Sequence, residues 1–540
     1  MSKVYTEAEL NKLNKSTLIE MLITTQERLD KLDQSMERLI EQIAISNNQR
    51  FGRKSEKLDV IEGQLNLFNE AEKLTETLWV PEPSIDEVVV KPKPKKSKGT
   101  RDAELKGLPI EIIEHILPEE KLQEIFGDSW KELPVETYKR LKYVPAVYTV
   151  EEHQVHLYAG KNSEDNEIIV RADRPVDLLR NSIATPSLVS AIMNAKYVNA
   201  LPLYRIEQEF QRNDVSVRRQ VMANWMIQCA ERYLGLIYDR LHDEFLSLHI
   251  VQVDETTVTV TKDGRVAGSK SYMWVYRSGK HYDKTIILYD YQKTRSSEHA
   301  ERFISGFSGI CVSDAFSAYQ KLDREMEGIQ FAGCWAHSRR RFSDALKALK
   351  DKSEASNTVA YEALKQISAI YKLDNELAGK PPDEKLIGRQ LTVKPLVEAF
   401  FAWVKEKRNS AILLPGGKTA EGLDYCINQE KYLKVFLDDA EVPLDNNATE
   451  SALRGFVIGR NNWKLIDSIE GAKASAVIYS ITETAKANGL SPYKYLNHLL
   501  TIIPQHMDDK NRRFLDDLLP WAKNLPMECY NQKAIQQATE

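Results

Sequence analysis

The sequence lacks the features that mark membrane, secreted and zinc-stabilised proteins. No run approaches the roughly 18 apolar residues that a membrane-spanning helix needs, and the N-terminus, MSKVYTEAELNKLNK, shows no basic stretch followed by an apolar one. The five cysteines form no Cys-x-x-Cys pair, which argues against a disulfide framework and a structural zinc site. We therefore expect a cytoplasmic protein with reduced thiols and no membrane partner.

The chain also lacks an excess of positive charge. It carries 74 basic and 79 acidic residues, so any binding of nucleic acid must come from local basic patches. A hydrophobic content of 42% with 28% charged residues is typical of a globular protein. At 540 residues the chain is long enough for roughly three or four domains.

Residues 1–60 are predicted to contain a short coiled coil. From Leu18 to Ile43 apolar residues alternate at spacings of four and three, which is a heptad seam that Thr25 weakens. The alternative is an amphipathic helix packed on its own chain, but the polar flanks favour self-association. Residues 61–103 include the segment PEPSIDEVVVKPKPKKSKGTR, which predicts an extended basic linker. This linker is either simply solvated or contacts phosphates without recognising sequence.

Two modules are predicted between the linker and residue 248. Residues 104–175 carry short alternating stretches that indicate a small β-rich module, and they contain no cysteine, so zinc is not expected there. Residues 176–248 are predicted to be helical. Two helices around a turn at Asn213 and Asp214, the second starting near Ser216, could form a DNA-binding helix-turn-helix. An ordinary helical hairpin is the reading that the pattern alone favours.

The character of the chain changes to strands after Leu248. The segments HIVQVDETTVTV, SYMWVYRSG and KTIILYDY predict three consecutive strands, EHAERFISGF a helix, and GICVSDAFSAY and QFAGCWAH two further strands. This order indicates a multidomain α/β protein whose residues 249–345 begin a sheet of ribonuclease-H type. A helical insertion follows at 346–440, the sheet domain is completed at 441–490, and a helical tail occupies 491–540.

Two carboxylates end neighbouring strands of this predicted sheet. Asp254 ends the apolar part of the first strand, and Asp314 ends the strand after the helix. Side chains alternate along a strand, so Asp254 and Glu255 point to opposite faces and only one of them can join a shared site. We choose Asp254, although a slip of one residue in register would exchange the two.

A third carboxylate is expected from a helix that crosses the sheet. The segment PLDNNATESALRGFVIGRNNW supplies Glu450 near the start of such a helix. Alternatively, Asn447 and Glu450 form a capping-box-like pair that satisfies backbone donors, or Arg454 pairs with Glu450 one turn later. Three carboxylates suit hard cations, and two Mg²⁺ ions about 3.5–4 Å apart can drive an in-line phosphoryl displacement.

Polar and basic residues surround these positions in the sequence. The Cys-x-x-His pair at Cys334 and His337 has no second pair to complete a zinc site, so a core or supporting role is expected. Residues that could support the carboxylates are His337, Cys334, Asn446 and Asn447. Residues that could contact DNA phosphates, unless they are simply solvated, are Arg218, Arg219, Arg339, Arg340, Arg341, Arg454, Arg460 and Lys464.

Taken in order, the segments RFGRKSEKL, LPLYR, VDET, SDAFSAY, CWAHSRRRF and DNNATESALRGFVIGRNNW resemble the successive landmarks of the insertion sequence 66 family of transposases. The resemblance covers nearly the whole chain. It implies a catalytic domain of the DDE type, with Asp254, Asp314 and Glu450 as ligands of Mg²⁺ or Mn²⁺. It also implies an N-terminal leucine-zipper-like region, binding to the terminal inverted repeats of the element, and accessory proteins encoded by the same element.

The chain departs from the family pattern in two places. Members commonly carry a cysteine-based zinc module before the helical region, but residues 104–175 contain no cysteine. Ser451 follows Glu450 where arginine is common, so the role of that arginine is not carried over. We expect a DNA transposase that cleaves and joins strands of double-stranded DNA at the nucleoid. The alternatives are a nuclease with the same carboxylates and a DNA-binding protein that has lost catalysis.

Overall fold

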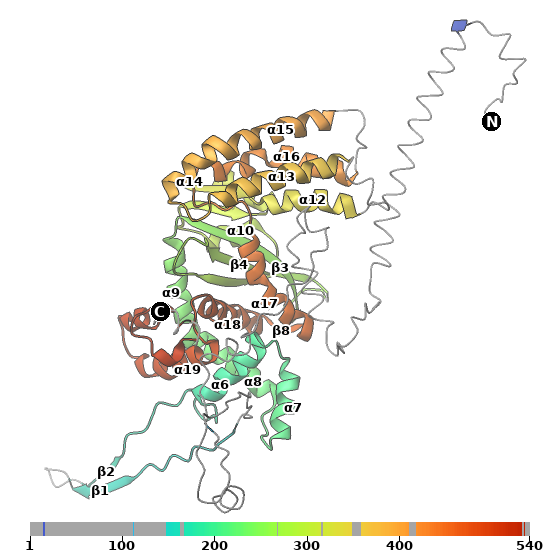
Figure 1. Cartoon of the computed structure of the whole chain (residues 1–540). Helices are drawn as coiled ribbons and strands as arrows, with labels where there is room; N and C mark the ends of the chain where they lie inside the picture. The colour runs from blue at the N-terminus through green and yellow to red at the C-terminus, as the bar shows by residue number, and fades with distance from the viewer. Residues whose placement is uncertain are drawn as a thin grey trace, which may run out of the picture.

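The structure is a computed structural model, and it describes residues 15–16, 112, 147–161, 167–266, 268–314, 317–347, 358–409, 417–531 and 534. The predicted coiled coil and basic linker lie outside the described residues, apart from Lys15 and Ser16. Of the predicted β-rich module, the described part forms a two-stranded antiparallel hairpin, β1 (Leu157–Lys161) and β2 (Glu167–Arg171). Figure 1 shows this hairpin projecting away from the body.

A mixed sheet forms the centre of the body (Figure 1). Its strands are β3 (Ile250–Lys262), β4 (Lys270–Ser278), β5 (Ile287–Gln292), β6 (Gly309–Ser313) and β7 (Ile329–Gly333). They lie in the order β5-β4-β3-β6-β7, and the short β8 (Ile466–Ser468) pairs with the far end of β3. The first three strands are antiparallel, whereas β6 and β7 run parallel to β3. All five strands lie in the segments for which strands were predicted.

Helices surround this sheet on all sides. Before it come α6 (Pro186–Met193), the π-helical turn η2 (Asn194–Val198), α7 (Leu203–Arg212), α8 (Arg219–Cys229), η3 (Ala230–Leu234) and α9 (Gly235–Leu246). Within it lie α10 (Ser297–Phe303) and α11 (Ser317–Glu325), and α12 (Trp335–Lys347) follows β7. The insertion contains α13 (Val359–Glu376), α14 (Pro382–Gly388), η5 (Arg389–Val393), α15 (Lys394–Asn409) and α16 (Lys418–Leu433). The chain then forms α17 (Asn447–Trp463), α18 (Ile469–Ala487) and α19 (Pro492–Ile502), followed by short 3₁₀ turns.

The helices pack into two hydrophobic cores that share the sheet. One core joins the helices before the sheet to β3–β5 and the C-terminal helices, with Tyr197, Trp225, Tyr276 and Tyr479 among its buried rings. The other joins the insertion to β6, β7 and α12, and Trp335 lies against the rings of three phenylalanines there. The helices before the sheet therefore share a core with the sheet itself.

Helix α18 satisfies the backbone of the edge strand β5. Ser480, Thr484 and Asn488 lie one helical turn apart. In the same order they face Tyr289, Ile287 and Thr285, which lie two residues apart along the chain. The N–H groups of these three residues donate to the side-chain oxygens of Ser480 (2.7 Å), Thr484 (3.0 Å) and Asn488 (3.2 Å). The Thr484 hydroxyl also donates to the Ile287 carbonyl at 2.9 Å. A side-chain row thus replaces the neighbouring strand that the edge would otherwise need.

Among the described residues, no helix combines the length and the apolar character that crossing a membrane requires.

The hydroxyl of Thr484 should contribute more to the free energy of unfolding than the hydroxyl of its buried neighbour Thr482. In Thr484→Val the Ile287 N–H and carbonyl lose their partner inside the protein, and we expect the free energy of unfolding to fall by roughly 1–3 kcal/mol. In Thr482→Val the lost hydroxyl donated only to carbonyls of its own helix, so the loss should be smaller. Denaturant unfolding of both variants measures the difference. Equal losses would show that burial, not the strand edge, sets the contribution of Thr484.

Candidate active site

Strand β3 places Asp254 on the face of the sheet that α17 covers. Asp254 lies opposite Val275, which in turn lies opposite Tyr289, so the three side chains share one face. On that face the Tyr289 hydroxyl donates to the Ala452 carbonyl of α17 at 2.6 Å. The predicted alternation therefore directs Asp254 toward α17. Its Oδ1 accepts a hydrogen bond from the Glu255 N–H at 2.8 Å, which fixes one of the two carboxylate oxygens.

Asp314 follows β6, the parallel neighbour of β3. Because parallel strands end at the same edge of a sheet, Asp314 emerges beside the part of β3 that carries Asp254. Its side chain is 21% exposed, and Oδ2 lies 3.7 Å from Nη2 of Arg295. Asp254 lies within β3, which continues to Lys262, rather than at the end of its strand as predicted, and Asp314 lies beside it at the end of β6.

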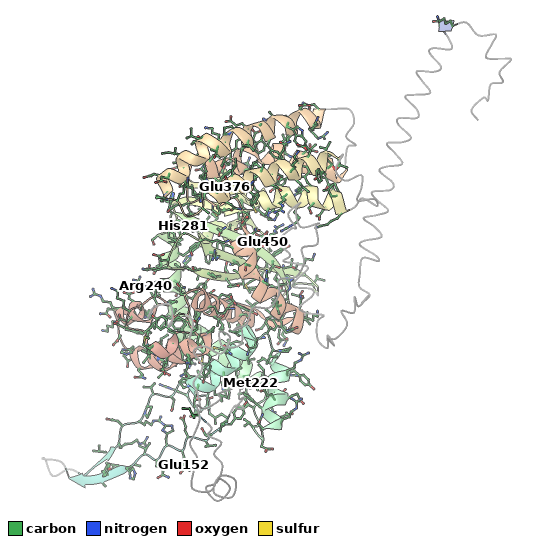
Figure 2. All side chains as sticks on the ribbon, in the orientation of Figure 1. Glu152, Met222, Arg240, His281, Glu376 and Glu450 are labelled. Carbon is green, nitrogen blue, oxygen red and sulfur yellow. The ribbon has the colours of Figure 1, made fainter. Side chains whose placement is uncertain are left out.

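Helix α17 brings Glu450 to the same place from almost 200 residues further along the chain. The fully buried Asn446 precedes α17, and its Nδ2 donates to the Val253 carbonyl of β3 at 2.9 Å. The Asn446 N–H donates to Sγ of Cys334 at 3.2 Å. Glu450 then lies in the first turn of α17, and Figure 2 shows it between the sheet and the helical insertion.

The capping-box interpretation of Glu450 is wrong. Helix α17 begins at Asn447 with Asn446 as its N-cap, and no side chain caps it. The side chain of Asn447 bonds to Asp445 instead, at 2.9 Å. The carboxylate of Glu450 accepts hydrogen bonds from Nη2 of Arg340 at 3.1 and 3.3 Å, so it points outward from the helix toward α12.

Negative charge is concentrated around Asp254. Burial raises the pKa of its carboxyl well above the usual range, and the nearby charges of Glu255, Asp314 and Glu450 raise it further. Four carboxylates from two strands and one helix are therefore close enough to repel one another. Such a group is stable only with protons, cationic side chains or a bound cation among its members.

Two cationic side chains supply part of this compensation. Arg295, which the sequence analysis did not single out, donates to Glu255 through Nε at 2.6 Å and also lies beside Asp314. The Glu255 side chain is only 1% exposed, and its other oxygen accepts from the Tyr319 hydroxyl at 2.7 Å. Arg340 pairs with Glu450 from the other side. Glu255, Arg295 and Tyr319 thus form a buried support beneath Asp314.

The residues predicted to support the carboxylates lie close by. Cys334 is buried, burial raises the pKa of its thiol to about 12, and its sulfur accepts a hydrogen bond from the Asn446 N–H. The pKa of His337 is lowered, by burial and by Arg340, while Glu450 and Asp314 act in the opposite direction. Its Nδ1 is buried without a hydrogen-bond partner in the structure. The lowered pKa favours the neutral imidazole of His337 near the acidic group.

The predicted DNA-contacting residues are found in several different settings. Arg218 and Arg219 are exposed at the start of α8, and Arg339 is half-buried on α12. Arg341 lies 4.4 Å from the centre of the Tyr425 ring. Arg460 donates to Thr256 at 2.9 Å and to the Thr257 carbonyl, which ties α17 to β3. Burial lowers the pKa of Arg454, and Lys464 is exposed where α17 ends.

The donor set fits a hard divalent cation. Asp254, Asp314 and Glu450 offer only carboxylate oxygens, which Mg²⁺ and Mn²⁺ prefer, and a cation there would offset the charge repulsion that, after burial, raises the pKa of Asp254. Within the described part of the chain, no three His, Cys, Asp or Glu side chains are already arranged as a metal cage. The carboxylates would therefore have to turn from Arg295 and Arg340 toward a cation.

Comparison with known proteins identifies matching family models along most of the chain. The model described as "Transposase IS66 family" matches residues 181–474, "IS66 C-terminal element" matches residues 480–521, and "Transposase C of IS166 homeodomain" matches residues 38–113. Similar curated proteins come from Sinorhizobium fredii (strain NBRC 101917 / NGR234). "Uncharacterized protein y4qI" is 29% identical over 427 residues, which cover 76% of each chain. "Uncharacterized protein y4jD" is 27% identical over 394 residues, which cover 71% of this chain and 75% of that protein.

The two neighbouring asparagines before Glu450 should differ in their contribution to stability. In Asn446→Ala the Val253 carbonyl loses its buried donor, and we expect the free energy of unfolding to fall by roughly 1–3 kcal/mol. Asn447→Ala removes only an exposed bond to Asp445 and should change it by less than about 0.5 kcal/mol. Denaturant unfolding of the two variants tests this, and an equal effect would mean that Asn446 does not anchor α17.

Proposed function

The chain belongs to the insertion sequence 66 family of transposases, and from that premise we propose that it cleaves the ends of its own element and joins them to target DNA, with Asp254, Asp314 and Glu450 as the catalytic carboxylates. The observation that carries this proposal is the convergence of these three acids. They come from β3, from the end of β6 and from α17, and the nearby charges of the other two raise the pKa of Asp254.

The sheet supports the proposal as well. Three antiparallel strands followed by two parallel ones, in the order β5-β4-β3-β6-β7, have the arrangement that we propose to be ribonuclease-H-like. In this reading the helices from α13 to α16 are an insertion between β7 and α17. The proposed catalytic domain therefore comprises residues 249–345 and 441–490.

The three carboxylates would hold two divalent cations, Mg²⁺ or Mn²⁺. Bound there, such cations supply activation of the attacking oxygen and stabilisation of the leaving oxygen in an in-line displacement at phosphorus. Water is the attacking group in cleavage, and the freed 3′-hydroxyl is the attacking group in joining. Each step forms one P–O bond and breaks another, so no covalent enzyme intermediate and no external energy source are needed.

The remaining residues of the site position these groups. Glu255 and Tyr319 hold Arg295 beside Asp314, and Asn446 holds the first turn of α17 against β3. The side chain of Arg340 is 46% exposed although it pairs with Glu450. It can therefore leave that carboxylate and bind a DNA phosphate instead. His337, whose lowered pKa favours the neutral imidazole, can donate one hydrogen bond and accept another without adding charge.

The larger assembly follows from the reaction. Cutting two ends and joining them together needs at least two active sites, so we propose that the protein self-associates, with the predicted coiled coil contributing. Its substrate would place it on the nucleoid in the cytoplasm, and accessory proteins of the same element can act with it. Zinc has no role in this proposal, because the five cysteines form no Cys-x-x-Cys pair and none of them occurs in residues 104–175.

Replacing each acid by its amide tests the triad. Asp254→Asn, Asp314→Asn and Glu450→Gln should each lower Mg²⁺-dependent cleavage and joining of labelled DNA bearing the element's ends by at least about a hundredfold, since even supporting residues of metal sites contribute 10–100-fold. DNA binding should persist. The matched controls are Asp467→Asn in β8 and Glu470→Gln in the first turn of α18, two exposed acids whose replacement should leave full activity. If an amide variant at one of the three positions stays fully active, that position is not a ligand.

Wild type that binds but never cuts would favour the non-catalytic alternative, and cutting without joining of precut ends would favour a nuclease.

Removing Arg340 should increase the affinity of the site for Mg²⁺. Arg340 competes with a cation for Glu450, and an exposed ion pair contributes about 0.2–1 kcal/mol, so Arg340→Gln should lower the Mg²⁺ concentration for half-maximal cleavage by up to about fivefold. Arg341→Gln, whose side chain lies on Tyr425, should leave it unchanged. Activity measured against Mg²⁺ concentration decides the matter. An unchanged midpoint in Arg340→Gln would show that Arg340 does not compete with the metal.

A further inference from the structure

We propose that helix α8 reads DNA bases through an exposed polar row formed by Gln220, Asn224 and Gln228, and that α17 couples this reading to the active site. This inference rests on the proposed function and adds to it a site for sequence recognition. The ligand is double-stranded DNA, approached through its major groove.

The two helices α7 and α8 are joined by a tight turn. Helix α7 ends at Arg212 and α8 begins at Arg219, and the chain reverses at Asp214 with a φ of 59°. The Glu207 carboxylate accepts a hydrogen bond from the Arg219 N–H at 3.2 Å, which fixes the start of α8 against α7. The second helix starts at Arg219 rather than near Ser216 as predicted, so Arg218 precedes it.

Helix α8 has one buried and one exposed side. Met222, Trp225, Met226 and Cys229 are buried in the core shared with the sheet. Figure 2 labels Met222 among the helices below the sheet. Packing of this kind leaves the opposite side of the helix rigid and accessible.

The exposed side carries the residue types that recognise bases. Gln220 and Asn224 are exposed and Gln228 is half-buried, and their spacing of four places them in a row along the helix. Within the part of the chain that the structure describes, none of these three side chains forms a hydrogen bond with another residue. Gln and Asn can each make paired hydrogen bonds to adenine in the major groove, which admits an α-helix. Val221, 39% exposed beside this row, offers an apolar contact of the kind that thymine methyl groups accept.

Charge around this row favours DNA over a protein partner. Four arginines on the two helices are exposed, namely Arg205, Arg212, Arg218 and Arg219. Arginines that flank a base-reading row would contact phosphates, which orients the helix without selecting sequence. The row itself is uncharged and polar, whereas the core of a protein–protein interface is enriched in aromatic residues, methionine and arginine.

Helix α17 connects this region to the carboxylates. Asn462, in its last turn, donates to the Ala200 carbonyl at 2.9 Å, and Lys196 of η2 lies 4.1 Å from the ring centre of Trp463. Tyr197 packs edge-on against Trp463 and Tyr479, and its hydroxyl lies 3.2 Å from that of Ser475. Figure 1 shows α17 extending from the sheet toward α6 and α8. Glu450 and Trp463 are 13 residues apart on α17, so Glu450 lies about 20 Å along the helix axis from the residue that contacts η2.

Selection of bound duplexes from a randomised DNA library, with the full chain, tests the inference. We expect wild type to enrich a sequence motif, and Gln220→Ala/Asn224→Ala to lose the preference at one or more base pairs by at least about fivefold while still binding DNA. Arg218→Ala should weaken binding to the preferred and to unrelated duplexes by the same factor. Gln505→Ala, an exposed glutamine near the C-terminus, is the matched control and should behave as wild type.

The outcomes separate the two proposals. If the double variant enriches the same motif as wild type, bases are read elsewhere on the chain and the inference fails, although cleavage that depends on Asp254 would leave the proposed function standing. Cleavage by wild type without any enriched motif would also overturn the inference. If wild type neither enriches a motif nor cuts DNA, both proposals fail. Asp254→Asn, in contrast, should enrich the wild-type motif and not cut.

Discussion

Helix α17 is attached to strand β3 at both ends, and the arrangement of the carboxylates depends on this attachment. Asn446 donates to the Val253 carbonyl before the helix starts, and Arg460 donates to Thr256 and to the Thr257 carbonyl near its end. Between them the Tyr289 hydroxyl holds the Ala452 carbonyl. Without these contacts Glu450 would have no reason to lie near Asp254, because the two residues are separated by the whole helical insertion. The position of the third acid is therefore set by buried polar contacts outside the site itself.

The attachment of α17 also places Glu450 near other acids, which is electrostatically unfavourable. Asp254 has three acidic neighbours, of which α17 supplies Glu450 while Glu255 and Asp314 belong to the sheet, and burial disfavours its ionised form before their repulsion is added. Arg295 lies beside Glu255 and Asp314, and Arg340 of α12 pairs with Glu450, so both arginines relieve part of this repulsion. The arginines thus offset part of the negative charge, and the proposed cation would offset more of it. On binding, a cation would replace the arginines as the partner of the acids, and a DNA phosphate would replace the acids as the partner of the arginines. Each charge would therefore exchange one partner for another.

The sequence predicted those features that depend on local periodicity. The order of strands, the opposite faces of Asp254 and Glu255, and the position of Asp314 at a strand end follow from alternation and from the ends of apolar runs. Glu450 was proposed on the resemblance, since its local pattern fitted a capping box equally well. Arg295 and Tyr319 were not predicted, because their partner Glu255 lies 40 and 64 residues away and no periodicity connects them. The hydroxyl row of α18 was missed for the same reason, since Thr484 and Ile287 are 197 residues apart. The predicted coiled coil and linker remain predictions.

The helices before the sheet share its core instead of forming a separate unit on a linker. Tyr197 packs between Trp463 and Tyr479, and the Tyr238 hydroxyl of α9 donates to the Tyr289 carbonyl of β5 at 3.0 Å. Tyr289 also contacts α17 through its own hydroxyl, so one residue links the helices before the sheet to the helix that carries Glu450. A DNA-binding surface on a flexible tether could deliver an end to the site in many orientations. A surface built on this shared core restricts the orientation instead, and the distance between the bases that are read and the bond that is cut becomes a property of the fold.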